Sequence, residues 1–192
     1  MIKKEVEKIL QFVQKPARYV GGELNSVIKD PNKVDIRYAF CFPDIYEIGM
    51  SHLGMKILYG LVNDREDSWC ERVFAPDVDM EEQMRKNNVP LFALESGDYI
   101  KDFDIIGFTL MYELCYTNVL NMLELAGIPL YSKDRTELAP IICVGGPCAC
   151  NPEPIADFVD IVFLGDGEDS TNAVLDLLKE CKKMGATKQE FL

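Results

Sequence analysis

Apolar residues gather in five short runs along the chain, separated by segments in which they recur every three or four positions. Most of these runs contain few polar residues, which is typical of strands that are covered on both faces of a sheet. Proline or glycine bounds several of them, as expected where a strand ends in a turn. The sequence therefore predicts strands at residues 34–42, 69–75, 103–110, 141–144 and 158–164, with a further short edge strand at residues 91–95.

The segments between the runs have the spacing of amphipathic helices. In residues 49–63, for example, Met50, Leu53 and Ile57 fall on one stripe. Strands that alternate with such helices favour an α/β fold, with a Rossmann-like or flavodoxin-like parallel sheet of about five strands and helices on both faces. The predicted helices span residues 2–13, 49–63, 77–86, 114–126 and 169–184.

The same pattern divides the chain into three parts. Helical spacing near the N-terminus stops at Pro16, and a glycine turn and a polar stretch follow, so residues 1–33 are expected to form an N-terminal helical arm. Residues 34–186 are expected to form the α/β domain. No capping signal closes the chain, and we expect residues 187–192 to begin a linker to a domain that this chain lacks.

The charge balance restricts the partners. Twenty Lys and Arg residues stand against 32 Asp and Glu residues, which gives a formal net charge of −12. Without a block of basic residues, the chain has little to attract nucleic acid or an anionic membrane surface. No apolar run approaches the roughly 18–20 residues of a membrane span, and the N-terminus lacks the apolar stretch of a signal peptide. The sequence predicts a cytoplasmic protein that binds neither membrane nor nucleic acid.

Histidine and cysteine offer little for metal binding or hydrolysis. With one histidine in the chain, a Cys/His zinc site or histidine-based acid–base catalysis has few candidates, and we assign no catalytic residue and no metal ligand. The seven cysteines form no disulfide framework and are expected to be free thiols, including Cys148 and Cys150 in a loop. His52 is expected to be an ordinary surface or core histidine.

Candidate binding residues lie in the loops after the predicted strands. In a parallel α/β sheet, ligands bind beyond the carboxyl ends of the strands. Side chains there can reach a crevice, and glycines let a ligand approach the backbone or leave room for a flat group. The polar residues can also be explained as helix caps, and the double glycine as a tight turn. The candidates are Asp44, Tyr46, Gly49, Thr109, Met111, Gly145 and Gly146.

These loops resemble those of the cobalamin-binding domain, whose signature is Asp-x-His-x-x-Gly after the first strand, Ser-x-Leu after a middle strand and Gly-Gly after a later one. The chain has Asp44-x-Tyr46-x-x-Gly49, then Thr109-x-Met111, then Gly145-Gly146. Together with the segments at residues 16–19, 42–44 and 165–168, the chain resembles the N-terminal cobalamin-binding-like domain of a bacterial radical SAM protein family. The resemblance implies that cobalamin contacts the seven candidate residues. It also implies an iron–sulfur cluster and S-adenosylmethionine in a C-terminal radical SAM barrel of the same polypeptide.

Two departures from the family pattern affect this interpretation. Tyr46 stands where the cobalt-ligating histidine would be, and a neutral phenol is a poor cobalt ligand. A radical SAM barrel holds its cluster with Cys-x-x-x-Cys-x-x-Cys, and this chain has no such run, so the fragment alone is expected to bind neither cluster nor S-adenosylmethionine and to be inactive.

Two functions for the domain follow. It binds cobalamin or gates substrate for the missing barrel, or it is a cofactor-free structural or interaction module of the same fold. A nucleotide-binding module is disfavoured, because the chain has neither Gly-x-Gly-x-x-Gly after the first strand nor a Gly-x4-Gly-Lys-Ser/Thr loop. Cobalamin binding further requires a deep channel for the nucleotide tail beside the double glycine.

Overall fold

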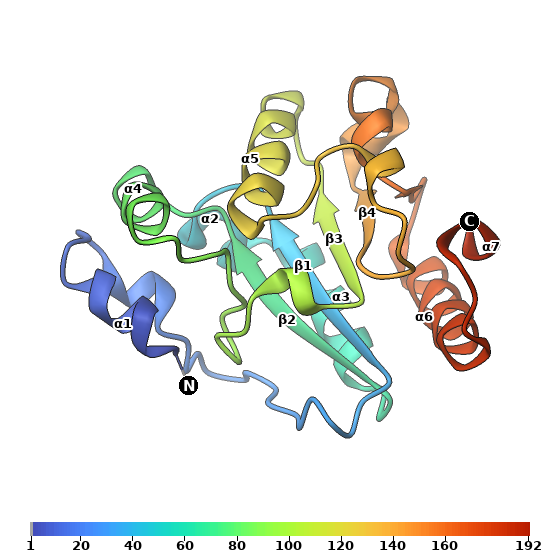
Figure 1. Ribbon diagram of the computed structural model, residues 1–192, viewed down its shortest axis with the longest axis horizontal. Coiled ribbons are helices and arrows are strands. Elements are labelled where there is room, and N and C mark those ends of the chain that lie inside the picture. The colour runs from blue at the N-terminus through green and yellow to red at the C-terminus, as the bar shows by residue number, and fades with distance from the viewer. Residues whose placement is uncertain (1) are drawn as a thin grey trace.

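A five-stranded parallel sheet forms the centre of the computed structural model, which describes residues 2–192 (Figure 1). The strand order is β2-β1-β3-β4-β5, and every neighbouring pair is parallel. This is the flavodoxin-like order, in which the direction of winding reverses between β1 and β3. The predicted α/β fold is confirmed. The strands are β1 (Ile36–Phe42), β2 (Ser68–Phe74), β3 (Ile105–Thr109), β4 (Ile141–Gly145) and β5 (Ile161–Val162).

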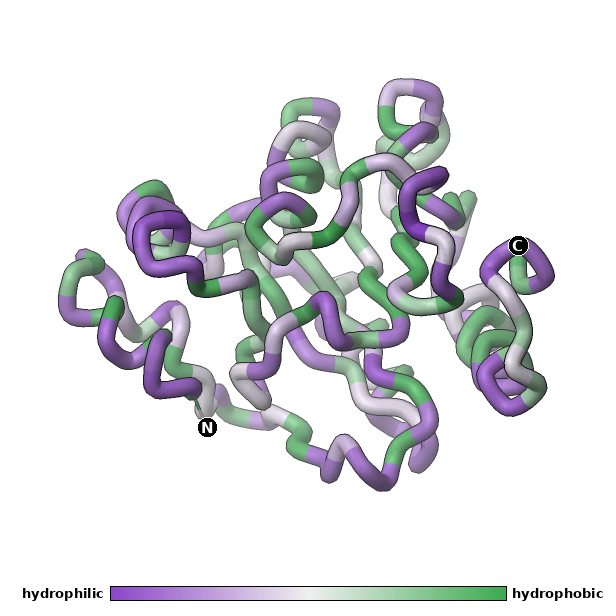
Figure 2. Tube along the Cα trace, in the orientation of Figure 1, coloured by the Kyte–Doolittle hydropathy of each residue, from purple (hydrophilic) through white to green (hydrophobic). Residues whose placement is uncertain are grey.

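Helices cover both faces of the sheet. On one face, α4 and α5 bury side chains such as Met80 and Met122 in a core shared with Ala39 of β1, and α1 packs against α4. On the other face, α3 and α6 bury Met55 and Leu178 in a second core. Figure 2 shows hydrophobic stretches along the central strands and a mixture of hydrophilic and hydrophobic residues along the helices. The helices are α1 (Lys4–Leu10), α2 (Tyr46–Ser51), α3 (Leu53–Asn63), α4 (Val78–Asn87), α5 (Tyr116–Ala126), α6 (Gly167–Met184) and α7 (Lys188–Phe191).

Three predicted elements differ from the structure. The helix at residues 49–63 is two helices, because the chain breaks at His52, whose backbone is extended. Residues 91–95 do not form a strand; in the part of the chain that the structure describes, they contribute one isolated bridge, between Phe92 and Tyr99. The last strand has only two residues, because a 3₁₀ segment occupies Glu153–Phe158 and ends two residues before it.

The side chain of Asp160 takes over part of the role of the missing strand residues. It accepts a hydrogen bond from the backbone N–H of Ile142 at 2.7 Å, and it is fully buried. Arg135 and Lys188 reach the same carboxylate at 3.0 and 2.7 Å. Because Lys188 belongs to α7, this cluster of charges attaches the last helix to the edge of the sheet.

Both ends of the chain pack against the sheet domain. In the N-terminal arm, Arg18 pairs with Glu47 and Asp77. Near the C-terminus, Thr187 and Glu190 form a capping box at the start of α7, a local signal that the sequence analysis overlooked. The division into an arm, a domain and a linker stays a prediction. Within residues 2–192, no helix has the length and apolar character needed to cross a membrane.

Candidate functional site

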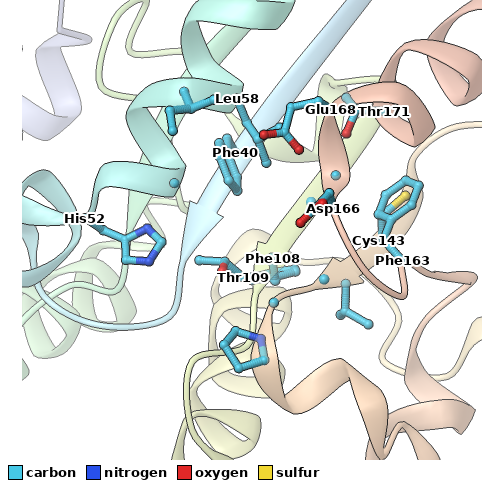
Figure 3. Close-up of a pocket in the computed structure, with 18 of the residues that line it drawn as sticks. Phe40, His52, Leu58, Phe108, Thr109, Cys143, Phe163, Asp166, Glu168 and Thr171 are labelled. Atoms are coloured by element: carbon cyan, nitrogen blue, oxygen red, sulfur yellow. The ribbon is translucent and has the colours of Figure 1, made fainter.

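A cleft of about 270 Å³ lies at the carboxyl end of the sheet, between α3 and α6 (Figure 3). Side chains of β1, β3 and β4 form its floor, and the loops after β3, β4 and β5 surround its mouth. This position includes the reversal point between β1 and β3, where flavodoxin-like sheets bind ligands. The fold therefore places the cleft where the strand-end argument predicts a site.

The floor consists of side chains that point from the sheet toward α3 and α6. Tyr38 and Phe40 come from β1, and Cys143 comes from β4. Gly107 of β3 gives Tyr38 its place, because a Cβ there would stand 2.0 Å from the tyrosine hydroxyl oxygen. Phe163, in the loop after β5, closes one side. The floor is thus aromatic and largely apolar.

His52 lies at the mouth of the cleft, on the α3 side (Figure 3). It is the N-cap of α3, and its Nδ1 accepts a hydrogen bond from the backbone N–H of Met55 at 3.1 Å. Burial lowers the pKa of His52, so the ring is neutral and carries its proton on Nε2. That nitrogen is then a hydrogen-bond donor and has no lone pair for a metal. Gly54 allows this position, since a Cβ there would approach the ring to 2.9 Å.

Sequence reasoning treated His52 as ordinary and missed its place in the cleft. The available signal was the pair of glycines, Gly49 and Gly54, on either side of it. Glycine on both sides of one polar residue favours a break in a helical pattern, and the residue at the break is a candidate N-cap.

The charged residues that line the cleft are acidic. Asp166 and Glu168 lie on the α6 side, and neither carboxylate makes a hydrogen bond or an ion pair within residues 2–192. No lysine or arginine lines the cleft. An anionic group such as a phosphate would therefore find no countercharge inside it, whereas a neutral or cationic group meets no repulsion.

The structure brings four of the seven predicted residues together at the cleft. Thr109 and Met111 lie there, and the threonine hydroxyl donates to the methionine sulfur at 3.6 Å. Gly145 and Gly146 lie there as well. A Cβ on Gly145 would meet Phe163 at an ordinary 3.5 Å, so this position is open toward the cleft.

The other three predicted residues lie outside the cleft, around the start of α2. Asp44 accepts hydrogen bonds at 2.7 Å from the backbone N–H of Ile45 and from the Tyr112 hydroxyl. The ring of Tyr46 packs edge-on against Phe74 of β2, with 5.4 Å between the ring centres. A Cβ on Gly49 would stand 2.3 Å from that same phenylalanine. Packing against β2 thus accounts for Tyr46 and Gly49, and contact with a ligand at these three positions stays a prediction.

Comparison with known proteins identifies the family. Residues 54–192 match the model of the family described as "Radical SAM proteins, N-terminal". The chain belongs to this family. The radical SAM N-terminal domain is also 30% identical over 135 residues to an uncharacterized protein of Methanocaldococcus jannaschii. That match covers 69% of this chain and 24% of the relative, so the chain corresponds to about a quarter of the longer protein. No solved structure matches this chain.

Metal ligands are not assembled in this radical SAM N-terminal domain. Among residues 2–192, no group of three or more histidine, cysteine, aspartate or glutamate side chains is placed to hold a metal ion. All seven cysteines are free, and five of them are buried.

Proposed function

We propose that this chain is the ligand-binding N-terminal domain of a radical SAM protein, and that its cleft takes the nucleotide tail of cobalamin. The observation that carries the proposal is the position of the cleft. It opens beside Gly145 and Gly146 and is lined by Thr109 and Met111, the residues in which the chain resembles cobalamin-binding domains. A channel beside the double glycine is the feature that this function requires and that the sequence alone does not reveal.

The shape and lining of the cleft suit the base of such a tail. Phe40, Leu58 and Phe163 offer apolar surface to a flat ring, and Gly145 adds no side chain of its own. Its volume of about 270 Å³ is near the lower end, roughly 300 Å³, of ligand pockets in general. The cleft can thus hold one ring system, and a macrocycle would have to stay outside it.

The residues present do not fit ligation of cobalt by this chain. Tyr46 packs on Phe74 away from the cleft, and Nε2 of His52 carries a proton. Bound cobalamin would supply methyl-transfer chemistry, and this chain would hold its nucleotide tail in the cleft between Thr109 and Gly145. Replacing Tyr46 by histidine is accordingly expected to leave binding unchanged, because that position does not face the cleft.

The whole protein is proposed to carry an iron–sulfur cluster and S-adenosylmethionine in a C-terminal barrel of the same polypeptide. Exposed leucines at this end of the domain support docking of that barrel on the edge around the cleft mouth. Leu53, Leu114 and Leu164 expose 68%, 82% and 70% of their surface, and contact with the barrel would bury this apolar surface. In this position the domain would present its ligand to the barrel or gate access to it.

A second candidate, a cofactor-free interaction module, is favoured by one specific observation. Asp166 and Glu168 are unpaired beside the cleft, and no basic residue lines it. The nucleotide tail of cobalamin contains a phosphate, which gains nothing from such surroundings. If the phosphate cannot stay in solvent, the domain serves only as a docking surface for the barrel.

Co-elution distinguishes the two candidates. The protein is incubated with hydroxocobalamin and passed through gel filtration, and the visible absorption of the protein peak is recorded. We expect retention by the wild type and loss with Gly145→Val, which fills the open side of the cleft. Gly60→Val is the matched control, because Gly60 lies in α3 outside the cleft with free space around it. If the wild type retains no cobalamin, the cofactor function is wrong and the interaction module remains.

A further inference from the structure

The hydroxyl of Tyr38 has no hydrogen-bond partner within residues 2–192, although the residue is only 6% exposed. It lies at the floor of the cleft, on the space left by Gly107. Among the described residues, the side-chain polar atoms that are both unpaired and inaccessible to solvent belong to Glu23, Arg37 and Arg135. The hydroxyl oxygen of Tyr38 is not one of these atoms, so it is accessible. The hydroxyl therefore faces the cleft.

An unpaired tyrosine hydroxyl is unusual at this depth. Polar groups at this depth almost always bond to the protein or to ordered water, and one that has no protein partner and faces a cleft is available to a ligand. Tyr59, on the same face of the sheet, follows the rule, since its hydroxyl oxygen accepts a hydrogen bond from the backbone N–H of Val27 at 2.7 Å. The hydroxyl of Tyr38 is therefore free to form a hydrogen bond with a ligand atom in the cleft.

The chemistry of the floor restricts what that atom can be. Burial raises the pKa of Tyr38 well above its usual range, so the hydroxyl stays protonated and can donate. Burial likewise raises the pKa of the Cys143 thiol, which stays neutral. The hydroxyl of Thr109 already donates to Met111. With aromatic rings around it and no basic residue in the lining, the floor suits an uncharged, flat group with one acceptor.

We propose that Tyr38 is the specificity-determining residue of the cleft: its hydroxyl donates a hydrogen bond to an acceptor nitrogen on the inner edge of an uncharged heteroaromatic base. The inference rests on the proposed function in so far as the cleft must bind the base of a ligand. It does not depend on that ligand being cobalamin. The acceptor nitrogen of a benzimidazole or a purine has the required chemistry.

Two bicyclic probes of nearly equal size test the donor. Benzimidazole has an acceptor nitrogen, whereas indole has only an N–H donor. Ligand-observed NMR titrations are run on the wild type, on Tyr38→Phe and on Tyr59→Phe, together with thermal unfolding of the free proteins. We expect the wild type to prefer benzimidazole, and Tyr38→Phe to weaken benzimidazole binding by roughly threefold to tenfold, the range expected for one hydrogen bond. Indole binding should not change.

The thermal unfolding separates a binding role from a structural one. Tyr38→Phe should leave the melting temperature of the free protein unchanged or raise it, because the hydroxyl it removes is unpaired. Tyr59→Phe should lower the melting temperature and leave both affinities unchanged. If Tyr38→Phe destabilises the free protein as Tyr59→Phe does, or if both probes bind equally or not at all at millimolar concentration, the inference is wrong.

Cobalamin co-elution keeps this result distinct from the proposed function. Benzimidazole binding that depends on Tyr38, without retention of cobalamin, would support the role of Tyr38 and refute cobalamin as the ligand. Retention of cobalamin that Tyr38→Phe does not weaken would support the proposed function and overturn the role of Tyr38.

Discussion

Substitution by alanine should destabilise the fold much more at Gly146 than at its neighbour Gly145. Gly146 has φ 97° and ψ 179°, a conformation that essentially only glycine adopts. A Cβ there would stand 2.9 Å from the carbonyl oxygen of Leu110, and that carbonyl is held by the backbone N–H of Cys148 at 3.0 Å. The N–H of Leu110 in turn donates to the carbonyl of Gly145 at 2.7 Å, so the backbone cannot withdraw.

The magnitude follows from these contacts. A non-glycine residue in this conformation costs about 1–3 kcal/mol, and the fixed backbone of Leu110 places Gly146→Ala at about 2–3 kcal/mol. For a chain of this length, that corresponds to a fall in melting temperature of roughly 5–10 °C. Gly145→Ala, with ordinary backbone angles and a 3.5 Å contact to Phe163, should change the free energy of unfolding by about 1 kcal/mol at most.

Urea unfolding measures both variants. The single tryptophan, Trp69, is 2% exposed and reports loss of the core by fluorescence, and circular dichroism reports loss of the helices. The reasoning fails if Gly146→Ala unfolds at the same urea concentration as Gly145→Ala. The result also decides how ligand binding is tested, because a substitution at Gly146 perturbs the fold whereas one at Gly145 perturbs only the cleft.

Three further predictions concern charge and thiols. Hydrogen bonding to Arg65 holds the pKa of Asp67 well below its usual range, so this stabilisation is complete above about pH 4 and is lost as the pH falls through the folded pKa. Asp67→Asn should therefore cost about 2 kcal/mol in urea unfolding at pH 7, and this cost should begin to fall as the pH drops below about 4. Asp160→Asn leaves two buried cations without their carboxylate and should cost about 3–5 kcal/mol in the same assay, and a smaller loss would show that these charges are solvated. Cys150 is exposed and should react with a thiol reagent in the folded protein, whereas the five buried cysteines should react only after unfolding.

The sheet could be predicted because burial on both faces leaves a direct trace in the sequence. Six of the seven residues of β1 (Ile36–Phe42) are buried, and the run of apolar letters follows from that. The edge strand β5 was harder to predict. The apolar run at residues 158–164 indicates a full strand, but the side chain of Asp160 bonds to the backbone of Ile142 where a ladder would continue. Whether an aspartate turns inward to a backbone N–H depends on the charges around it, which come from distant parts of the chain.

The candidate site was predictable to the extent that the strand ends determine it. Thr109 and Gly145 are the last residues of the adjacent strands β3 and β4, and the parallel ladder brings them opposite each other in register. The loop after β1 behaves differently, because it turns toward β2. There the ring of Phe74 occupies the space beside Gly49, so packing alone explains a glycine that had been attributed to ligand approach. The spacing of a motif does not show which side of the strand its loop will take.

Tyr38 and His52 also line the cleft, and neither was among the residues predicted for the site. Tyr38 reads as one more apolar strand residue, and His52 as one more position on a helix. Each gains its role from a glycine elsewhere, since Gly107 leaves the space for the tyrosine hydroxyl and Gly54 leaves the space for the imidazole. A glycine near a strand end can therefore mean room for a ligand or room for the protein's own ring. In this domain the second kind of glycine brings two hydrogen-bond donors to the cleft, because Gly54 and Gly107 leave room for His52 and Tyr38.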